Sequence, residues 1–329
     1  MTANWVALVL IYLVVIAGSF VRITGSGMGC PDWPKCFGSW IPPSEVSELP
    51  DNYQKIYAEG RAKKVEKFSN FLFSIGLQET ADRLKNDPNL LKEQPFNAKK
   101  TWTEWVNRLF GFLAGNVMLL CFFWMFAQFR KRKLLLISGL NLILMGIQAW
   151  FGSIVVASNL VPWTITVHML LALVIIGIQL YIIKKISPKQ SQTIFNNKFS
   201  TIAIWLSLGI IFYQMFLGTQ VRESIDALIV DGVPRTQWIE QSGMSFFVHR
   251  SFSWIVLLLL GYVAYHNEKS AKLVSIRWVF GLLLFEIISG ILLAYADVPG
   301  LVQTSHLLMA TVIFGILTMV VFRTKVISN

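Results

Sequence analysis

The stretch TVHMLLALVIIGI at residues 166–178 occurs again, in the same frame, as TSHLLMATVIFGI at residues 304–316. Each copy places one histidine, His168 or His306, near the start of an apolar run long enough to form a helix. A glycine stands sixteen residues before each histidine, and a proline lies between the two, so the similarity covers a helix pair. Self-similarity on this scale predicts an internal duplication.

The earlier part of each half shows a second correspondence. The matching segments are residues 105–110 (WVNRLF) with 247–252 (FVHRSF), and residues 18–22 (GSFVR) with 218–222 (GTQVR). Each half is therefore expected to contain four helices. The alignment puts Asn107 opposite His249, so the second half carries two histidines where the first carries only His168.

The composition is that of a membrane protein. Of 329 residues, 54% are hydrophobic and only 14% are charged, which lies far from the usage of soluble domains. Apolar runs of about 20 residues, enough to cross a hydrocarbon core, fall near residues 5–22, 103–128, 134–157, 162–183, 200–220, 246–265, 275–295 and 301–322. We predict an all-α integral membrane protein whose eight transmembrane helices form two pseudosymmetric four-helix bundles.

The duplication also suggests where the chain divides. The N-terminal half would be residues 1–185, and the C-terminal half residues 186–329. Residues 24–101 form a long outer loop in the first half, and its polar part has helical patches such as residues 53–72. We expect that segment to cover the outer face as a cap.

The net charge of +11 does not indicate a nucleic-acid surface, because the distribution of the basic residues instead predicts how the chain is oriented in the membrane. The basic residues fall in alternate connections between spans, at Arg130 to Lys133, Lys184, Lys185, Lys189, Lys198, Lys269, Lys272, Arg277, Arg323 and Lys325. By the positive-inside rule, both termini are expected to be cytoplasmic. No cleavable signal or transit peptide is recognisable near Met1, which favours a bacterial plasma membrane.

Two cysteines share the first outward loop. Cys30 and Cys36 lie in a compartment where a structural or redox-active disulfide can persist, with free thiols and an incomplete metal site as the alternatives. Spacing alone does not decide among them. Cys121 lies within a span and is expected to be a small core residue.

Four arginines stand at the outer ends of helices, against the general charge bias. They are Arg22, Arg108, Arg222 and Arg250. A guanidinium is well suited to neutralise a buried anion, and the repeat-related positions favour an anionic ligand. The alternative is that these side chains snorkel to the membrane surface.

Acidic side chains also occur within the spans. Glu104 lies three residues before Asn107 and so shares its helical face, which makes it a candidate functional residue at membrane depth. A plain helix-entry glutamate is the alternative. Gln148 and Glu286 stand at matching places, four residues before the repeat glycines, where a hydrogen bond to a neighbouring helix or a proton path would account for them.

The histidines are the candidate metal ligands. His249 and His306, on the second and fourth helices of one half, can ligate one metal axially from two sides, and haem fits such a site. Zinc is disfavoured because no cluster of cysteine and histidine with tetrahedral spacing is present in the sequence. The outer arginines would meet the haem propionates.

The whole ordered set resembles one known family, the haem A synthases. The residues that carry the resemblance are 21–27 (VRITGSG), 30–34 (CPDWP), Cys36, 104–108 (EWVNR), His168, His249 with Arg250, and His306. The resemblance implies an eight-helix membrane enzyme of two four-helix halves. It would oxidise the C8 methyl group of haem O, by successive hydroxylations, to the formyl group of haem A for cytochrome oxidase biogenesis.

The resemblance also implies roles for particular residues. His249 and His306 match the pair that holds a haem b cofactor, whereas Glu104 and His168 match the half that binds the substrate. Cys30 and Cys36 match an outer-loop cysteine pair found in many members.

Asn107 departs from this pattern, because the better-known members have histidine there. The substrate iron would then have His168 as its only histidine ligand. We expect the C-terminal haem to relay electrons and the N-terminal haem to react, with Glu104 as the catalytic residue that orients water or shuttles protons.

The partners implied are haem O, an electron carrier, membrane lipid, haem O synthase, and a terminal oxidase or its assembly factors, with homo-oligomerisation left open. Two other functions compete with the synthase. One is a haem b electron-transfer cytochrome, which would be expected to keep two histidines in both halves. The other is a non-catalytic haem carrier, which would need no acidic residue beside the ligand face.

Overall fold

The computed structural model describes residues 1–32, 34–86, 95–128, 132–157, 162–187 and 198–324. Trp33, residues 158–161, and the basic residues Arg130, Lys131, Lys189 and Lys325 of the orientation argument lie outside that range. The helices are α1 (Thr2–Ile23), α2 (Tyr53–Ser74), α3 (Gln78–Asn86), α4 (Ala98–Gln128), α5 (Arg132–Ala157), α6 (Pro162–Ile186), α7 (Lys198–Val230), α8 (Trp238–Gln241), α9 (Met244–Lys269), α10 (Val274–Tyr295) and α11 (Gly300–Arg323).

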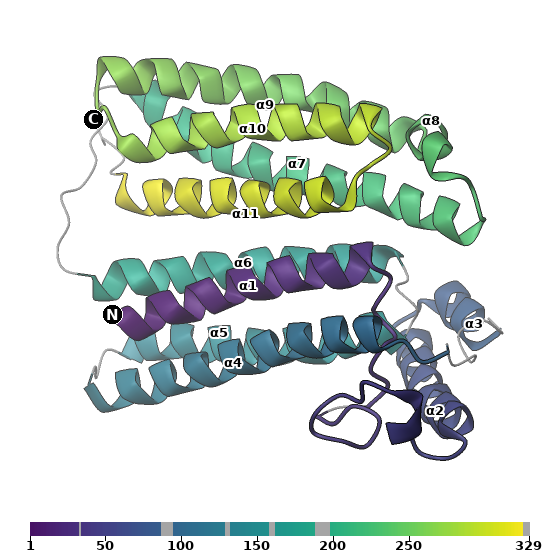
Figure 1. Ribbon diagram of the computed structural model, residues 1–329. Coiled ribbons are helices and arrows are strands. Elements are labelled where there is room, and N and C mark those ends of the chain that lie inside the picture. The colour runs from purple at the N-terminus through teal and green to yellow at the C-terminus, as the bar shows by residue number, and fades with distance from the viewer. Residues whose placement is uncertain (33, 87–94, 129–131, 158–161, 188–197, 325–329) are drawn as a thin grey trace.

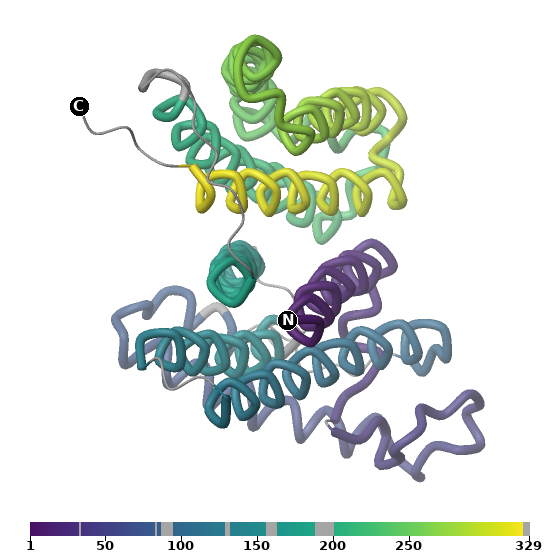
Figure 2. The backbone as a smooth tube through the Cα atoms, turned by 90° about the vertical axis from the view of Figure 1, so that its left-hand side faces the viewer, coloured from purple at the N-terminus to yellow at the C-terminus, as the bar shows by residue number. Residues whose placement is uncertain are grey.

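Eight of the described helices are long and apolar enough to cross a membrane, which confirms the predicted helical membrane fold. Helices α1, α4, α5 and α6 contact one another, and so do α7, α9, α10 and α11 (Figure 1). Helices α1 and α6 meet α11, and α6 also meets α7, where the two groups touch (Figure 2). The proposed division after residue 185 falls at the end of α6, and the pseudosymmetry of the groups stays a prediction.

Two helix ends differ from the hydropathy limits, for local reasons. Helix α4 begins at Ala98, before the apolar run, because the side chain of Asn97 accepts the Lys100 N–H at 3.1 Å and caps the helix. Helix α7 continues ten residues past the expected 220. It ends in a Schellman-type turn, in which Gly232 has a φ of 73° and Val233 N–H donates to Leu228 O at 2.9 Å.

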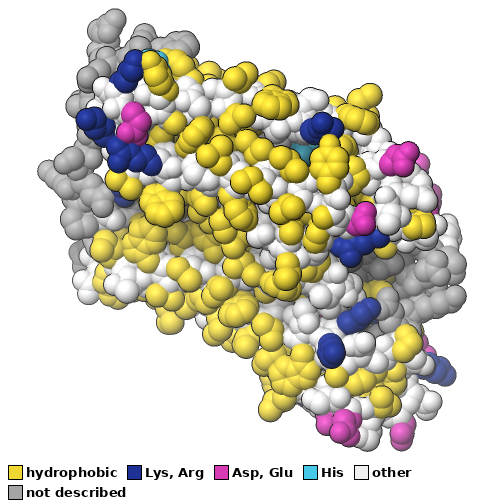
Figure 3. Space-filling view, turned by 45° about the horizontal axis from the view of Figure 1, so that its top comes forward, with side chains coloured by type: hydrophobic (Ala, Val, Ile, Leu, Met, Phe, Trp, Pro, Cys, Tyr) yellow, Lys and Arg dark blue, Asp and Glu magenta, His cyan; other side chains and the backbone are white. Residues whose placement is uncertain are grey.

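One apolar core runs through both groups of helices. Its fully buried members include Ala7 of α1, Ile176 of α6, Ile204 of α7 and Leu317 of α11. Large apolar side chains also remain exposed around the outside, as expected of a surface that meets lipid. Figure 3 shows hydrophobic side chains over the middle of one face, with charged side chains towards its two ends.

Polar contacts fix the two groups of helices to each other. The Tyr12 hydroxyl of α1 donates to Thr311 O of α11 at 3.1 Å, and Ser19 Oγ lies 2.9 Å from Thr304 Oγ1. Thr166 of α6 donates to Glu223 Oε1 of α7 at 2.5 Å. Burying a polar group is costly unless it is paired, so these bonds favour one arrangement of the groups over others.

The polar insertion forms a cap at one end of the membrane helices, and its assignment to the outer face stays a prediction. Helix α2 contains the predicted helical patch and packs with α3 at the end of the molecule opposite both termini (Figure 1). Phe68 and Leu72 of α2 form a small core with Ile154 of α5, and Trp163 lies against it. The cap therefore rests on α5, close to the start of α6.

A tight turn sets the start of α11. Asp297 and Val298 have φ values of 54° and 53°, in the left-handed region that a β-branched residue rarely adopts. Arg235 donates to both of their carbonyl oxygens, and Gln303 Nε2 donates to Val298 O at 2.8 Å. These contacts hold a strained turn eight to nine residues before His306, the candidate ligand on α11. Gln303 itself lies in the first turn of that helix.

Candidate functional site

Each predicted ligand lies against a glycine of a neighbouring helix. A Cβ atom built on Gly152 of α5 would lie only 3.2 Å from Cε1 of His168 on α6, so the missing side chain makes room for the imidazole ring. The same arrangement recurs at three more pairs, which are His249 with Gly218, His306 with Gly290, and Asn107 with Gly18. The four positions matched in the sequence are therefore also alike in their packing.

The two histidines of the C-terminal half lie close together. The ring centroids of His249 and His306 are 6.5 Å apart, with 72° between the ring planes. Two metal–imidazole bonds of about 2 Å each, with the rings beyond them, put ring centres about 6 Å apart. An iron atom held axially by both rings thus fits this spacing.

The His306 ring is oriented by contacts to its Nδ1, which leave its Nε2 free to bind a metal. Its Nδ1 hydrogen-bonds with Ser289 Oγ at 2.7 Å and lies 3.0 Å from Glu286 Oε2. Both contacts come from α10, and they leave Nε2 as the nitrogen available to a metal. A carboxylate or hydroxyl on the far nitrogen is the usual way in which a protein orients a metal-bound imidazole.

Glutamine side chains bind the backbone carbonyl oxygens of the other two histidines. Gln148 Nε2 donates to His168 O at 2.9 Å, and Gln214 Nε2 donates to His249 O at 3.1 Å. Nδ1 of both rings is buried and has no hydrogen-bond partner within the described chain. A buried nitrogen without a partner is costly in a finished core, so these rings have capacity for a further ligand or donor.

Glu104 lies under the outer loop. It is 1% exposed, it accepts the Cys30 N–H at 2.9 Å, and it is paired with Arg108. Arg108 also donates to Cys30 O at 2.5 Å and to Asp32 O at 2.6 Å. The pair therefore anchors the loop to α4, directly above the face that carries Asn107.

The loop itself is closed by a disulfide between Cys30 and Cys36. Asp32 accepts the Phe37 and Gly38 N–H groups at 2.6 and 2.9 Å, which fixes the second half of the loop. Both cysteines are fully buried, and Phe37 packs against them. Of the alternatives for this pair, the structure contains the disulfide, while Cys121 is a buried free thiol as expected.

The four arginines are not equivalent. Arg22 of α1 and Arg222 of α7 both bind Asp226, the latter at 2.8 Å, and Arg222 also donates to Gln303 Oε1 at 2.5 Å. This cluster joins the two groups of helices, and within the described chain its two guanidinium groups share a single carboxylate, which leaves one positive charge uncompensated. Arg250 is exposed and has no carboxylate partner among the described residues.

The donor set fits a haem better than a protein-chelated metal ion. Within the described residues, no group of three or more His, Cys, Asp and Glu side chains could hold a metal. A haem needs only axial ligands from the protein, together with cations for its propionates. The buried Nε atoms of Arg22 and Arg222, which have no partner in the described chain, leave donors for such anions.

A family model described as cytochrome oxidase assembly protein, COX15-CtaA, matches residues 2–318 of this chain. The chain belongs to the COX15-CtaA family. The match spans all eight membrane helices, so it covers both groups and every ligand position described above.

Curated relatives of this COX15-CtaA protein carry the name haem A synthase. One from Wolbachia sp. subsp. Brugia malayi is 23% identical over 343 residues, covering 95% of this chain and 93% of the relative. One from Bartonella tribocorum is 25% identical over 338 residues, covering 93% and 87%. One from Sinorhizobium fredii is 25% identical over 285 residues, covering 78% and 70%. The family resemblance noted in the sequence is thereby confirmed.

Two residues of the candidate site were not predicted from the sequence. Gln214 lies four residues before Gly218, the same spacing that singled out Gln148 and Glu286, so the pattern could have revealed it. Ser289 gave no such signal, because a serine beside a glycine in an apolar helix is unremarkable without its partner. The fourth histidine, His266, packs against Tyr262 with ring centroids 4.3 Å apart and lies away from the site.

Proposed function

We propose that this COX15-CtaA protein is a haem A synthase, which converts the C8 methyl group of haem O into the formyl group of haem A by successive hydroxylations. The observation that carries the proposal is the difference between the halves. One half has two imidazoles 6.5 Å apart, and the other has Asn107, whose amide oxygen is buried, where the first imidazole of that pair would stand. An iron with both axial positions filled suits electron transfer, whereas an iron with an exchangeable position suits chemistry.

The C-terminal half would hold haem b between His249 and His306. When bound, this haem supplies a reversible one-electron store. Ser289 and Glu286 fix the His306 ring through Nδ1, and Gln214 fixes the backbone at His249. These contacts orient the two ligands before the iron arrives, which lowers the ordering cost of binding.

The N-terminal half would hold the substrate, haem O, through His168. Asn107 lies on α4, with its Oδ1 buried and unpartnered in the described chain. An amide is a weak ligand for iron, so the position opposite His168 would stay open to water. Phe151, whose ring lies parallel to that of His168 to within 18°, limits how the imidazole can turn.

Glu104 is the proposed catalytic residue. Its carboxylate accepts bonds from Cys30 N–H and Arg108, and a carboxylate has about four acceptor positions, so water can still bind to it. When water supplies the oxygen, each hydroxylation breaks a C–H bond, forms a C–O bond, and releases two protons and two electrons. Glu104 would orient that water and take up a proton, and an electron carrier would remove the electrons.

The arginines would receive the propionates of the two haems. The support is that Arg22 and Arg222 keep unused donors and one net positive charge beside Asp226, and that Arg250 has no carboxylate partner in the described part of the chain. Arg108 would contribute less, because it already serves Glu104 and two loop carbonyls. Guanidinium groups match carboxylates in geometry as well as charge.

The proposed setting is a bacterial plasma membrane with both termini cytoplasmic and the haem sites towards the outer face. Alternation of basic connections supports this orientation. The proposed partners are haem O synthase as the source of substrate, a terminal oxidase or its assembly factors as the destination of haem A, and an electron carrier. A homo-oligomer would also be compatible with the extensive apolar surface.

The porphyrins bound to the purified protein test the function. The full chain is produced with and without a co-expressed haem O synthase, and the extracted pigments are identified by mass spectrometry. We expect haem b alone without the partner enzyme, and haem O, its hydroxylated intermediate and haem A with it. Haem b as the sole pigment in both samples would instead favour the electron-transfer cytochrome, and unmodified haem O would favour the carrier.

Gly218→Val is expected to remove the C-terminal haem. A Cβ at this position would already lie 3.3 Å from His249 Cε1, and the two further methyl groups of valine push the ring out of place. Haem content should fall about tenfold or more, as for other losses of ligand orientation, with loss of the low-spin absorbance of the C-terminal site. Gly209→Val is the matched control, since a Cβ at Gly209 of the same helix meets nothing within 4 Å; equal loss in both variants would contradict the packing argument.

A further inference from the structure

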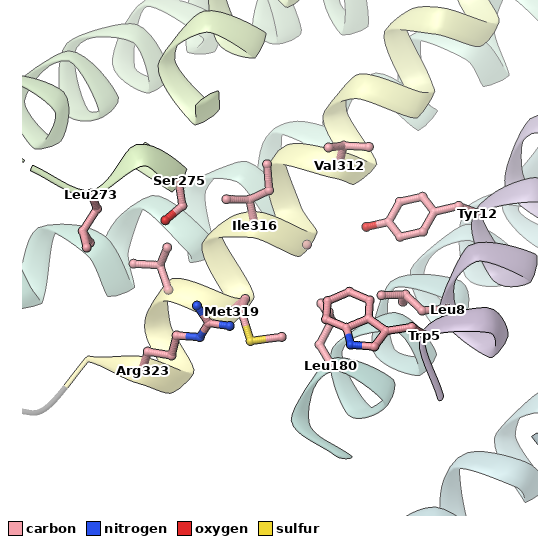
Figure 4. Close-up of a pocket in the computed structure, with 12 residues that line it drawn as sticks. Trp5, Leu8, Tyr12, Leu180, Leu273, Ser275, Val312, Ile316, Met319 and Arg323 are labelled. Carbon is pink, nitrogen blue, oxygen red and sulfur yellow. The ribbon is translucent and has the colours of Figure 1, made fainter. Parts of the chain in front are cut away.

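A cavity of about 340 Å³ lies between the two groups of helices at the end that carries both termini (Figure 4). Its walls come from α1 and α6 on one side and from α11 with the start of α10 on the other. This end is far along the helices from the candidate haem ligands, which lie near the opposite ends of α6, α9 and α11. The cavity is therefore separate from the proposed haem sites.

The cavity wall is almost wholly apolar. Leu8, Leu180 and Ile316 contribute aliphatic surface, and Trp5, which is 41% exposed, stands at the rim. The ring of Tyr12 also faces the space, while its hydroxyl is already bonded to Thr311 O. A volume of this size is at the lower end of the roughly 300–1,000 Å³ of small-molecule sites.

One charged side chain breaks that apolar wall. Arg323, the last residue of α11, lines the cavity, and its Nε is buried without a hydrogen-bond partner in the described chain. Lys184 of α6 lies close enough to Lys185 and to Arg323 for both of these charges to act on it. Among the described residues, none of these three cations is paired with a carboxylate.

This combination defines the chemistry of an occupant. It must offer a hydrocarbon segment to the wall and a negative group to Arg323. It must also reach the site from the membrane, because Trp5 is exposed near one end of a membrane helix, and tryptophan is enriched where side chains meet the lipid headgroups. A neutral isoprenoid would leave Arg323 unpaired, and a soluble anion would leave the apolar wall uncovered.

We propose that the cavity is a binding site for one anionic phospholipid of the leaflet at the termini, which is the cytoplasmic leaflet in the orientation proposed above. The phosphate binds Arg323, with Lys184 and Lys185 adding attraction, and one acyl chain lies along Leu8, Leu180 and Ile316. The lipid touches α1, α6 and α11 together, so it joins the two groups of helices at the end opposite the Arg22–Asp226–Arg222 cluster.

Lipid binding to the full-length, haem-loaded protein tests the proposal. Protein stripped of lipid in mild detergent is mixed with phosphatidylglycerol or with phosphatidylcholine of the same acyl chains, and bound lipid is counted by native mass spectrometry. Both lipids carry the phosphate, but only phosphatidylglycerol keeps a net negative charge, because the choline cation cancels that of phosphatidylcholine. We therefore expect the wild type to bind the first lipid about tenfold more tightly than the second. Arg323→Gln should abolish this preference, and Ile316→Trp, which fills the cavity, should weaken binding of both lipids.

Lys133→Gln is the matched control, because Lys133 is an exposed cation at the same end of the molecule that does not line the cavity. It should bind lipid as the wild type does, and unchanged haem spectra in all variants would show that each is folded. Equal binding of the two lipids by the wild type, an unchanged preference in Arg323→Gln, or a second copy of the chain seated on this face would overturn the proposal.

Discussion

Replacing His306 with alanine will remove haem b from the C-terminal half and abolish haem A formation. The remaining ring, His249, would hold the iron from one side only, and the cavity left opposite would be lined by Ser289 and Glu286. We expect the haem b content of the purified protein to fall to about a tenth or less of the wild type, since even loss of an outer contact costs about 10–100-fold in metal affinity. Quantitative pigment extraction and the low-spin haem absorbance measure the loss.

Two further variants make this result specific. Ser289→Ala keeps the ligand and removes one of its orienting bonds, so it should weaken haem b binding by about tenfold without abolishing it. His266→Ala removes a histidine whose ring packs near Tyr262 and Tyr265, away from the candidate ligands, and should leave haem b content unchanged. Normal haem b content in His306→Ala would mean that this residue is not an iron ligand.

Glu104→Gln is expected to give the second large effect, on turnover instead of cofactor content. The amide oxygen can still accept the Cys30 N–H, but the charge that pairs with Arg108 and the proton acceptor are both lost. Loss of a general base lowers rates by about 10²–10⁴, so haem O and partly oxidised haem should accumulate while haem b stays bound. Mass spectrometry of pigments from cells that also make haem O measures the ratio.

The contribution of Glu104 to anchoring the disulfide loop must be measured separately from its contribution to catalysis. Because the Glu104–Arg108 pair anchors the disulfide loop, the variant must be shown to keep Cys30 and Cys36 bonded and protected from thiol reagents. Glu268→Gln serves as control, since Glu268 is also paired with an arginine, Arg277, but is exposed. Full haem A formation by Glu104→Gln with an intact loop would restrict Glu104 to anchoring.

Much of this fold follows from the sequence, because hydropathy and the repeat depend on short-range patterns. The eight spans, the helix within residues 53–72 and the buried Cys121 were all predictable in this way. The helix ends were less so. The start of α4 depends on one capping side chain, Asn97, and the end of α7 on the left-handed Gly232, and neither changes the hydropathy.

The residues of the candidate site also differ in whether the sequence alone could predict them. The histidines, Asn107 and their glycines could be found because the duplication repeats them. The pairing of Arg22 with Asp226 could not, since it joins helices 204 residues apart in sequence, whereas Arg222 and Asp226 have the i,i+4 spacing of a single helix. The bond from Cys30 N–H to Glu104 likewise depends on how the loop folds back on α4. Such long-range pairs leave no periodic signal in a single sequence.

The central claim is that the two halves coordinate iron differently. Electron paramagnetic resonance of the purified protein loaded with haem b and haem O, wild type beside Asn107→His, tests it most directly. We predict one bis-histidine low-spin signal in the wild type, together with a second haem whose signal shifts when an external ligand such as imidazole is added. Asn107→His should convert that second signal into another bis-histidine one. Two bis-histidine signals in the wild type, or none, would contradict the account.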